Sequence, residues 1–459
     1  MFRKVLVANR GEIALRVIRA CHAVGARAVA VYSEADARSP HLAHADETIC
    51  IGPGPASQSY LNQDAILQAA LQTECQAIHP GFGFLSENAR FVARCEQQKL
   101  TFVGPSSRAI RLMGDKATAR ETMRLAGLPV MPGSKEVLAT AAEARAMADA
   151  VGYPVLLKAT AGGGGKGMRR VDAPEELEAQ FEAASREAAK AFGNGDLYLE
   201  KYIVGGRHIE FQVLADRWGH VIHLGERECS IQRNHQKLLE EAPASNFDAA
   251  LRSRIGEQIR VAMRALGYVN AGTIEFLMDA SGHLYFMEMN TRIQVEHPVT
   301  ELVTGIDLVA WQLRIAAGQK LTVQQDDVTW TGHAIEVRIN AEDPSQGFRP
   351  APGTVEVFDV PANGPQGPVR LDSHVTAGYR IPPNYDSMVG KLIVHGDSRA
   401  DALARLTEVL DEVRIEGVPT TLPLHRAIVR DPAFASGHYT CAFLPERPAL
   451  LTALTADAE

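Results

Sequence analysis

Short apolar runs alternate with helix-spaced apolar residues through the first hundred residues, and this alternation strongly constrains the fold. An apolar run at 4–9 is followed by helical spacing at 12–22 and a second run at 28–32. The pattern recurs at 65–71 with 77–79, and at 89–96 with 101–103. Because strand–helix–strand units place their strands parallel under a layer of helices, the sequence predicts a small doubly wound sheet.

The first turn of this predicted sheet, Asn9-Arg10-Gly11-Glu12, contains one glycine and lacks the G-x-G-x-x-G fingerprint of dinucleotide-binding folds. A dinucleotide-dependent oxidoreductase is therefore not indicated.

Composition excludes several classes of protein. The chain has 459 residues, 46% of them hydrophobic, which is enough for two or three domains with cores of their own. Its net charge of -8 argues against non-specific binding to nucleic acid or to an anionic membrane. The six cysteines show neither zinc-site nor disulfide-framework spacing, and there is no signal peptide or membrane-spanning run. We expect a cytoplasmic protein with no nucleic-acid or membrane partner.

The middle and end of the chain differ in pattern. Beyond the Pro-rich stretch 129–132 we expect helices at 139–151 and 174–191 and strands at 153–158, 197–201 and 208–215. From about residue 331 short segments separated by Pro and Gly predict strands at 333–339, 353–360, 369–371 and 391–395, with a helix at 399–410. This last part is expected to be a third, α+β domain.

A glycine-rich loop lies between two predicted strands and includes Gly163, Gly164, Gly165, Lys166 and Gly167. It fails the dinucleotide motif, which must open a helix, and the Walker A motif, which needs Ser or Thr after Lys. A strand–loop–strand glycine segment near several basic residues favours a lid over nucleotide phosphates. The alternative is a flexible surface hairpin.

The segment 288–298 alternates polar and apolar residues. If it were one strand, Glu288, Asn290, Arg292, Gln294 and Glu296 would line one face. Such a mixture of acids, amides and a guanidinium predicts a chemical site.

The preceding residues predict a β-hairpin. If Ser281-Gly282 is a two-residue turn, Ala280 pairs with His283, and Glu275 lies opposite Glu288. Two facing carboxylates need a cation between them, and with the oxygen of Asn290 they suit Mg²⁺.

A basic cluster at 226–237 stands out in an acidic protein. Together with Lys116, Lys158, Arg292 and Arg338 it predicts an electropositive pocket for polyanions such as a nucleoside triphosphate and a small oxyanion. No Ser-His-Asp or Cys-His pattern is evident, so phosphoryl transfer by positioning and charge neutralisation is favoured.

Several motifs together resemble the biotin carboxylases of the ATP-grasp superfamily, over nearly the whole chain. These motifs are Ala8-Asn-Arg-Gly-Glu-Ile13, His79-Pro-Gly-Phe-Gly-Phe-Leu-Ser-Glu-Asn88, Met113-Gly-Asp-Lys116, Lys158 with the glycine loop, Glu200-Lys201, Arg207-His208-Ile-Glu210, Gln232 to Lys237, Glu240-Glu-Ala-Pro243, Glu288 to Pro298, and Arg338-Ile-Asn-Ala-Glu-Asp343.

The resemblance implies an α/β and α+β fold of three domains. A Rossmann-like pre-ATP-grasp domain would cover 1–113, and an ATP-grasp domain would cover 114–325 with a mobile lid at about 131–204. A C-terminal biotin carboxylase domain would cover 331–446.

The resemblance also implies a ligase in which ATP activates bicarbonate to carboxyphosphate, which delivers CO₂ to N1′ of biotin. Residues implied to bind ATP are Lys116, Lys158, the glycine loop, Glu200, Lys201, Ile203, His208, Gln232 and His235. Those implied to bind Mg²⁺ or Mn²⁺, at two sites, are Glu275, Glu288 and Asn290. Those implied to bind bicarbonate are Lys237, Arg292, Gln294 and Val295, with Glu296 as general base and Arg338 stabilising the biotin enolate.

No Lys lies between two methionines, so the biotinylated carrier motif is absent, and no carboxyltransferase domain follows. We therefore expect a free-standing subunit, a homodimer by resemblance, acting on biotin attached to a carrier protein and working with carboxyltransferase subunits. Acetyl-CoA is the expected final acceptor; propionyl-CoA, 3-methylcrotonyl-CoA, pyruvate and 2-oxoglutarate systems are alternatives. Rivals are another ATP-grasp ligase, of carbamoyl-phosphate or purine type, and a non-catalytic nucleotide-binding regulatory subunit.

Three residues depart from the family pattern: Ala161 where some relatives have glycine, Asn234 where many have a basic residue, and Phe82 where Tyr is common. None removes a catalytic group. Ala161 and Asn234 bear on the lid and on ATP affinity.

Overall fold

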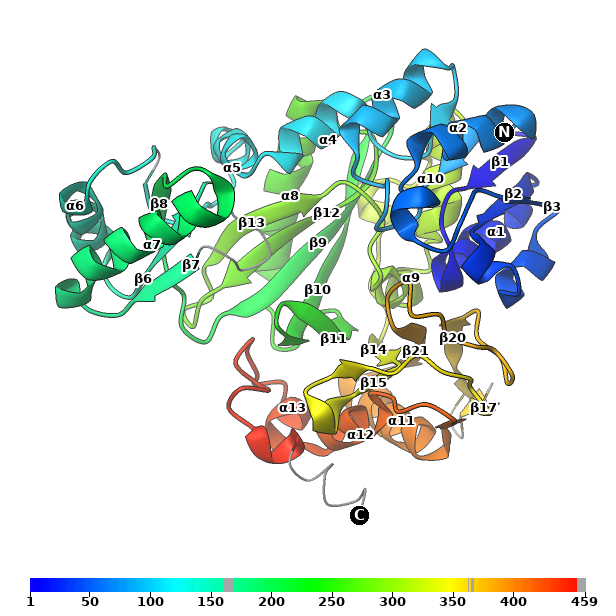
Figure 1. Cartoon of the computed structure of the whole chain (residues 1–459). Coiled ribbons are helices and arrows are strands. Elements are labelled where there is room, and N and C mark those ends of the chain that lie inside the picture. The colour runs from blue at the N-terminus through cyan, green and yellow to red at the C-terminus, as the bar shows by residue number, and fades with distance from the viewer. Residues whose placement is uncertain (135, 161–167, 362, 365–366, 452–459) are drawn as a thin grey trace. The chain divides into compact units, whose positions relative to one another are not determined.

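The computed structural model describes residues 1–134, 136–160, 168–361, 363–364 and 367–451 (Figure 1). The chain divides into two compact units. The first comprises Met1–Leu128, Arg207–Glu275 and Glu288–Glu459, and the second comprises Pro129–Gly206 and Phe276–Met287.

The first unit begins with a five-stranded sheet in the order β3-β2-β1-β4-β5, in which every neighbouring pair is parallel. The predicted doubly wound sheet is confirmed. The sequence pattern missed β3 because its side chains are only half-buried, as is usual for an edge strand. The elements are β1 (Lys4–Val7), α1 (Gly11–Ala23), β2 (Arg27–Tyr32), β3 (Glu47–Cys50), α2 (Gln63–Gln72), β4 (Ala77–His79), α3 (Ala89–Gln97), β5 (Thr101–Phe102), α4 (Ser107–Gly114) and α5 (Lys116–Leu125).

An eight-stranded sheet carries most of the rest of this unit, in the order β13-β12-β9-β10-β11-β14-β21-β20. The hairpin ends of β12 and β13, 276–278 and 284–287, belong to the second unit. The strands β14, β21 and β20, expected in a separate α+β domain, continue this sheet through the pairing of β11 with β14. The elements are β9 (Arg207–Ala215), β10 (Val221–Arg233), β11 (Gln236–Ala242), α8 (Ala249–Leu266), β12 (Asn270–Met278), β13 (Leu284–Asn290), α9 (His297–Thr304), α10 (Leu308–Ala316), β14 (His333–Asn340), β20 (Arg370–Ser373), β21 (Met388–Gly396), α11 (Arg399–Glu412), α12 (Leu422–Arg430) and α13 (Pro432–Ser436).

Shorter strands occur in pairs beside this sheet. The strand predicted at 353–360 is reduced to β17, which pairs with β22. The pairs are β15 (Glu342–Asp343) with β16 (Arg349–Pro350), β17 (Val357–Asp359) with β22 (Arg414–Glu416), and β18 (Asn363–Gly364) with β19 (Gly367–Pro368).

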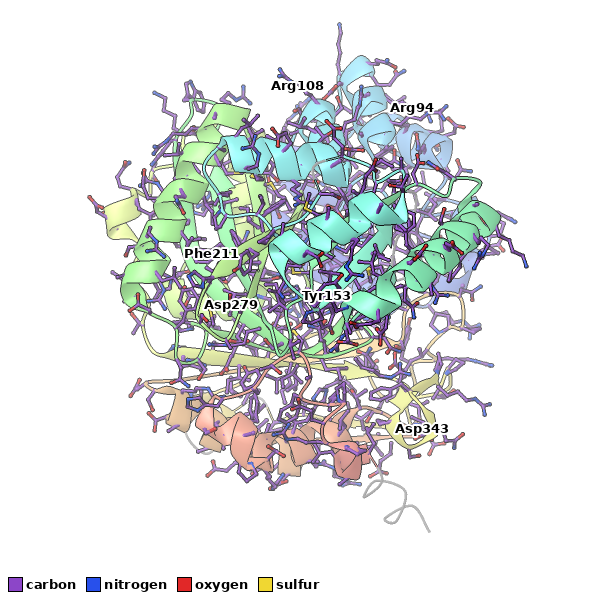
Figure 2. All side chains as sticks on the ribbon, turned by 90° about the vertical axis from the view of Figure 1, so that its left-hand side faces the viewer. Arg94, Arg108, Tyr153, Phe211, Asp279 and Asp343 are labelled. Carbon is purple, nitrogen blue, oxygen red and sulfur yellow. The ribbon has the colours of Figure 1, made fainter. Side chains whose placement is uncertain are left out.

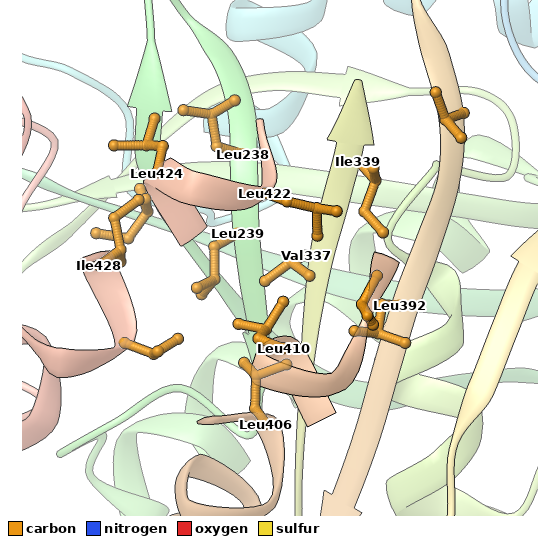
Figure 3. Packing of buried hydrophobic residues seen from close by; sticks show 14 of the residues in the cluster. Leu238, Leu239, Val337, Ile339, Leu392, Leu406, Leu410, Leu422, Leu424 and Ile428 are labelled. Carbon is orange, nitrogen blue, oxygen red and sulfur yellow. The ribbon is translucent and has the colours of Figure 1, made fainter. Parts of the chain in front are cut away.

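The two faces of β11, β14 and β21 differ sharply. On one face Leu239 pairs with Val337 and Val337 with Leu392, and these residues pack on Leu406 of α11 and Leu422 of α12 (Figure 3). Because side chains alternate along a strand, the intervening residues point the other way. On that second face Glu240 pairs with Glu336, and Arg338 pairs with Lys391. The apolar face forms a core, and the charged face is left for the site.

The second unit contains a three-stranded antiparallel sheet in the order β7-β6-β8, with a core that includes residues of two helices. Lys158 on β6 pairs with Met168 on β7, so the two strands flank residues 161–167 as the sequence predicts. The predicted glycine lid itself, Gly163 to Gly167, lies outside the described residues. The elements are α6 (Ala141–Val151), β6 (Val155–Ala159), β7 (Met168–Val171), α7 (Leu177–Phe192) and β8 (Leu197–Lys201).

The hairpin turn between β12 and β13 differs from the predicted one. The N–H of Asp279 donates to the carbonyl of His283 at 2.9 Å, so Asp279 and not Ala280 faces His283. Oδ1 of Asp279, labelled in Figure 2, accepts from the N–H groups of Ser281 and His283, both at 2.9 Å. Gly282, at φ +82°, completes a loop one residue longer than the two-residue turn. The predicted turn is therefore wrong, and the register derived from it, with Glu275 directly opposite Glu288, does not follow.

None of the helices in the described part of the chain has the length and apolar character needed to cross a lipid bilayer.

Candidate active site

The segment after β13 is not a strand. β13 ends at Asn290, and α9 begins at His297 with Pro298 in its first turn. Between them Gln294 and Glu296 are buried, and so is Ile293, so polar and apolar residues do not alternate between two faces. The prediction of one continuous strand is wrong, because Pro298 favours a helix start and side-chain contacts replace strand pairing.

Lys237 on β11 lies at the centre of the charged face. Its Nζ donates to Oε2 of Glu210 at 2.6 Å, to Oε1 of Glu275 at 3.1 Å and to Oε1 of Glu296 at 2.6 Å. Burial lowers the pKa of Lys237, but the surrounding acids outweigh this and raise it well above its usual value. One ammonium therefore joins acids from β9, β12 and the loop before α9.

Arg338 on β14 binds the other carboxylate oxygen of Glu296. Its guanidinium donates to Oε2 of Glu296 at 2.8 Å, and its Nε donates to Oε1 of Glu240 at 2.6 Å. Burial raises the pKa of Glu296, yet Lys237, Arg338 and Arg227 together lower it well below its usual range. Glu296 is thus a carboxylate fixed at both oxygens.

Arg227 on β10 is fully buried beneath these groups. It donates to Glu210 at 2.6 Å, to Oε1 of Gln294 at 2.7 Å and to Gln212 at 2.8 Å, with longer bonds to Thr300 and Thr273. A buried guanidinium is tolerated only when its donors are satisfied. It therefore fixes Gln294, one of the predicted bicarbonate ligands, from below.

Three predicted residues meet around Glu275. Oε1 of Glu275 accepts from Nδ2 of Asn290 and from Nε2 of Gln294, both at 2.8 Å. Oδ1 of Asn290 in turn accepts from Arg292 at 2.8 Å, and Nε of Arg292 donates to Oε2 of Glu87 at 2.9 Å. Glu87 also accepts from the N–H of Thr291 at 2.9 Å, so it anchors the start of the loop.

The predicted metal ligands Glu275, Glu288 and Asn290 form a hard-oxygen set. Burial raises the pKa of Glu288, and the charge of Glu275 raises it further while Lys116 lowers it. Two acids that repel one another next to an amide oxygen fit a divalent cation such as Mg²⁺. A second group, His208, Glu210 and Glu275, has its ligand atoms within 4.8 Å of one another, but Glu210 is already occupied by Arg227 and Lys237.

The predicted nucleotide residues of the first unit lie at the start of α5 (Lys116), on β9 (His208), on β10 (Gln232) and in the turn after β10 (His235). Nε2 of His208 is 3.3 Å from Oε2 of Glu275, and Nε2 of Gln232 donates to Sγ of Cys441 at 3.1 Å. Asn234 and His235 form the β10–β11 turn with φ of +49° and +65°. Because Asn adopts positive φ more readily than Arg does, the departure at Asn234 suits this turn.

Lys391 on β21 supports the loop from the charged face of the sheet, the face that carries Arg338. This fully buried residue donates from Nζ to the carbonyl of Val295 at 2.7 Å, and Oε1 of Glu12 lies 3.3 Å away. Asp372 is a more distant partner at 3.8 Å. The backbone at Val295, a predicted bicarbonate ligand, is thereby tied to β21.

The second unit holds the other predicted nucleotide residues. Lys158 on β6 donates to Oε2 of Glu200 on the neighbouring β8. Lys201 donates to the carbonyls of Gly152 and Tyr153, both at 2.8 Å. Ile203 follows β8 and is half-buried. Their roles toward ATP stay predictions.

The predicted electropositive pocket stays a prediction. Lys237, Arg227, Arg292 and Arg338 are each paired with carboxylates, so the described site is closely balanced in charge. Local attraction between these groups explains why they are buried together.

Sequence reasoning missed the supporting residues Glu87, Glu210, Arg227, Glu240 and Lys391. Glu87, Glu210 and Glu240 stand inside the quoted motifs, and Arg227 stands in the basic cluster. A charged residue between apolar residues of a predicted strand is a signal of a buried ion pair. For Lys391, which stands in none of these motifs, it was the only signal in the sequence.

The chain resembles known proteins over nearly its whole length. Three family models match: the biotin carboxylase N-terminal domain at 1–110, the carbamoyl-phosphate synthase L chain ATP-binding domain at 115–324, and the biotin carboxylase C-terminal domain at 336–446. A biotin carboxylase of Nostoc sp. is 54% identical over 97% of this chain and 99% of its own length. The 2-oxoglutarate carboxylase small subunit of Hydrogenobacter thermophilus is 51% identical over 98% of this chain and 94% of its own length.

A solved structure of the biotin carboxylase domain dimer of the Hydrogenobacter thermophilus 2-oxoglutarate carboxylase, in complex with MgADP, ADP and bicarbonate, has the same fold. It superposes with a TM-score of 0.91 at 50% identity, covering 98% of this chain and 99% of the other. Family models, full-length relatives and fold agree, and the chain belongs to the biotin carboxylases, the ATP-grasp ligases that form the carboxylating subunit of biotin-dependent carboxylases.

Proposed function

We propose that the chain carboxylates biotin on a separate carrier protein, using ATP and bicarbonate, through the residues assigned above. The observation that carries the proposal is the Glu296 carboxylate, held at one oxygen by Lys237 and at the other by Arg338. A carboxylate beside two cations that can bind an oxyanion suits a general base acting on bicarbonate.

Substrate binding would change the basicity of Glu296. Without bicarbonate, Lys237 and Arg338 keep the pKa of Glu296 low, which makes a carboxylate that accepts protons poorly. A bicarbonate anion near Lys237, Arg292, Gln294 and the Val295 backbone would share these cations. Glu296 would then regain basicity and accept the bicarbonate proton, so that the bicarbonate oxygen attacks the γ-phosphorus of ATP and ADP leaves.

Arg338 has a second role after carboxyphosphate has formed. Carboxyphosphate would break into CO₂ and phosphate, and this phosphate would take the N1′ proton of biotin. The negative charge left on the ureido oxygen would be stabilised by the fixed guanidinium. N1′ then attacks CO₂ released from carboxyphosphate. Phe82, where Tyr is common, removes none of these groups.

ATP and its metal would be held by the residues that the resemblance to biotin carboxylases implies. Glu275, Glu288 and Asn290 would hold Mg²⁺ or Mn²⁺, which neutralises phosphate charge when bound. Lys116, His208, Gln232 and His235 of the first unit would bind the nucleotide, as would Lys158, the glycine loop, Glu200, Lys201 and Ile203 of the second. The relative's complex with MgADP and bicarbonate supports this assignment.

The final acceptor is proposed to be acetyl-CoA, with carrier and carboxyltransferase subunits as partners and a homodimer as the assembled form. The dimer in the solved structure of the Hydrogenobacter thermophilus relative supports the homodimer. The acetyl-CoA acceptor rests on the family resemblance, because the relatives named biotin carboxylase name no acceptor. The 2-oxoglutarate carboxylase small subunit, which is about equally similar, favours that acceptor as the second candidate. Affinity purification from the native cell, with identification of the carboxyltransferase that accompanies the chain, distinguishes them.

ADP release by purified protein tests the proposed activity. With Mg²⁺ and ATP, the rate should depend on bicarbonate and rise with free biotin. ADP release at one rate with and without both compounds would contradict biotin carboxylase activity.

A further inference from the structure

Two fully buried carboxyl groups face each other directly behind Arg338. Glu240 on β11 pairs with Glu336 on β14, and both side chains are 0% exposed. Directly opposed residues in an antiparallel pair have Cβ atoms about 5 Å apart on the same face of the sheet. Arg338 lies two residues beyond Glu336 and therefore on that face as well.

Three of the four oxygens of this pair lack a hydrogen-bond partner among the described residues: Oε2 of Glu240 and both oxygens of Glu336. The fourth, Oε1 of Glu240, accepts from Nε of Arg338 at 2.6 Å. Two unpartnered buried anions at this separation would be strongly destabilising. A proton on one of them removes the repulsion and supplies a donor for the other.

The charges nearby decide which acid is neutral. Glu240 has Arg338 as a direct partner. No partner for Glu336 is found in the described ranges, and the ammonium of Lys391 opposite Arg338 is already bound to the Val295 carbonyl. Burial raises the pKa of Glu336 well above its usual value and that of Glu240 to about 7. Both observations favour an anionic Glu240 and a protonated Glu336.

We propose that Glu240 is a positioning residue that holds Arg338 through Nε, and that protonated Glu336 fixes Glu240 by donating to its free Oε2. The proposal rests on the proposed function of Arg338 and Glu296. It assigns roles to two residues beyond those that contact substrate.

This arrangement matters when Glu296 accepts a proton. A neutral Glu296 binds Arg338 less strongly than the carboxylate does, so one of the two anchors of Arg338 weakens during the reaction. Glu240 keeps the second anchor at Nε. The terminal nitrogen of Arg338 that faced Glu296 also contacts Oε1 of Glu240, so the guanidinium stays in place, where it can receive the biotin oxygen.

The test compares Glu240→Gln with a matched control, Glu226→Gln. Glu226 is another buried acid of the same sheet and accepts two bonds from Arg252, both at 2.6 Å. We expect Glu240→Gln to lower kcat for biotin-stimulated ATP cleavage at least ten-fold with KM for ATP within two-fold, and Glu226→Gln to lower kcat less than three-fold. Equal kcat losses in the two variants would overturn the positioning role.

The role of Glu336 is tested with two variants that differ in whether the side chain can donate a hydrogen bond. Glu336→Gln keeps a donor near Glu240, whereas Glu336→Leu has none, so we expect the Gln variant to be at least five-fold faster than the Leu variant. Equal rates would overturn the role of Glu336. If Glu240→Gln does not fold, Glu240→Asp replaces it, with the same expected loss of kcat at unchanged KM. If the wild-type protein shows no biotin-stimulated ATP cleavage, the proposed function itself is refuted. If the wild type is active and Glu240→Gln is equally active, only the positioning role of Glu240 is refuted.

Discussion

Nζ of Lys237 lies 2.6 Å from Oε1 of Glu296, so the proposed base is ion-paired before any substrate arrives. The pair is buried, and the pKa of Glu296 is lowered well below its usual range despite the opposing effect of burial. A base in this state is ionised but weak. Its use in catalysis therefore depends on an anionic substrate that draws Lys237 away.

Replacing the proposed base Glu296 should abolish turnover while ATP still binds. Glu296→Gln keeps the shape and a hydrogen-bonding side chain but cannot accept the bicarbonate proton, so we expect kcat to fall at least 100-fold. Binding of ATP, measured by calorimetry, should change less than about three-fold because no proposed nucleotide ligand is altered. The exposed variant Glu408→Gln is the control. Unchanged turnover would refute Glu296 as the base.

Replacing a metal ligand changes the requirement for Mg²⁺. Glu288→Gln removes one of two adjacent carboxylates, so the Mg²⁺ concentration for half-maximal activity should rise at least about ten-fold. An Mg²⁺ titration of ADP release at saturating ATP measures this. Glu342→Gln, a half-buried acid on β15, is the comparison. An unshifted titration would contradict the metal assignment.

Arg227 should matter greatly for stability. Arg227→Met leaves Glu210 buried without one of its two cations and Gln294 without its donor, which should cost about 3–5 kcal/mol. Arg186, 73% exposed and paired with Glu182, is the matched control, and Arg186→Met should cost less than about 1 kcal/mol. Urea unfolding followed by circular dichroism measures both. Similar losses in the two variants would show that the buried network is not stabilising.

Lowering the pH should remove the contribution that Glu241 makes to the free energy of unfolding. Burial raises its pKa, but the contacts from His333 and Arg399 outweigh this and lower the pKa from 4.5 to about 2. Because the folded pKa is the lower one, this contribution is complete above about pH 4.5 and is lost as pH falls toward 2. Between about pH 6 and about pH 3 the difference in unfolding free energy between wild type and Glu241→Gln should shrink by about 2 kcal/mol.

Urea unfolding at a series of pH values measures that difference. Glu408→Gln, which also removes one negative charge, is unfolded in parallel as the control. A wild-type minus Glu241→Gln difference that stays constant over this range would contradict the prediction.

The helices and strands could be predicted better than the site because they depend on the pattern of apolar residues close together in the sequence. The first sheet follows from apolar runs alternating with helical spacing, and β14, β21 and α11 follow from the same signals. The strand expected through Glu296 failed although its alternation was regular. Periodicity reports which residues could share a face, but Pro298 and the buried contacts of Gln294 and Glu296 decide that the chain leaves the sheet at Asn290.

By itself the sequence determined the order of strands and helices, the family, and which residue types are available for chemistry, because these depend on near neighbours and on motif spacing. Only the tertiary structure decided the partners of the charged groups. Lys237 meets acids 27, 38 and 59 residues away along the chain, and Arg338 meets Glu240 from a distance of 98 residues. Ion pairs of this kind depend on strand register and burial, which bring distant residues together and remove the water that would otherwise screen them.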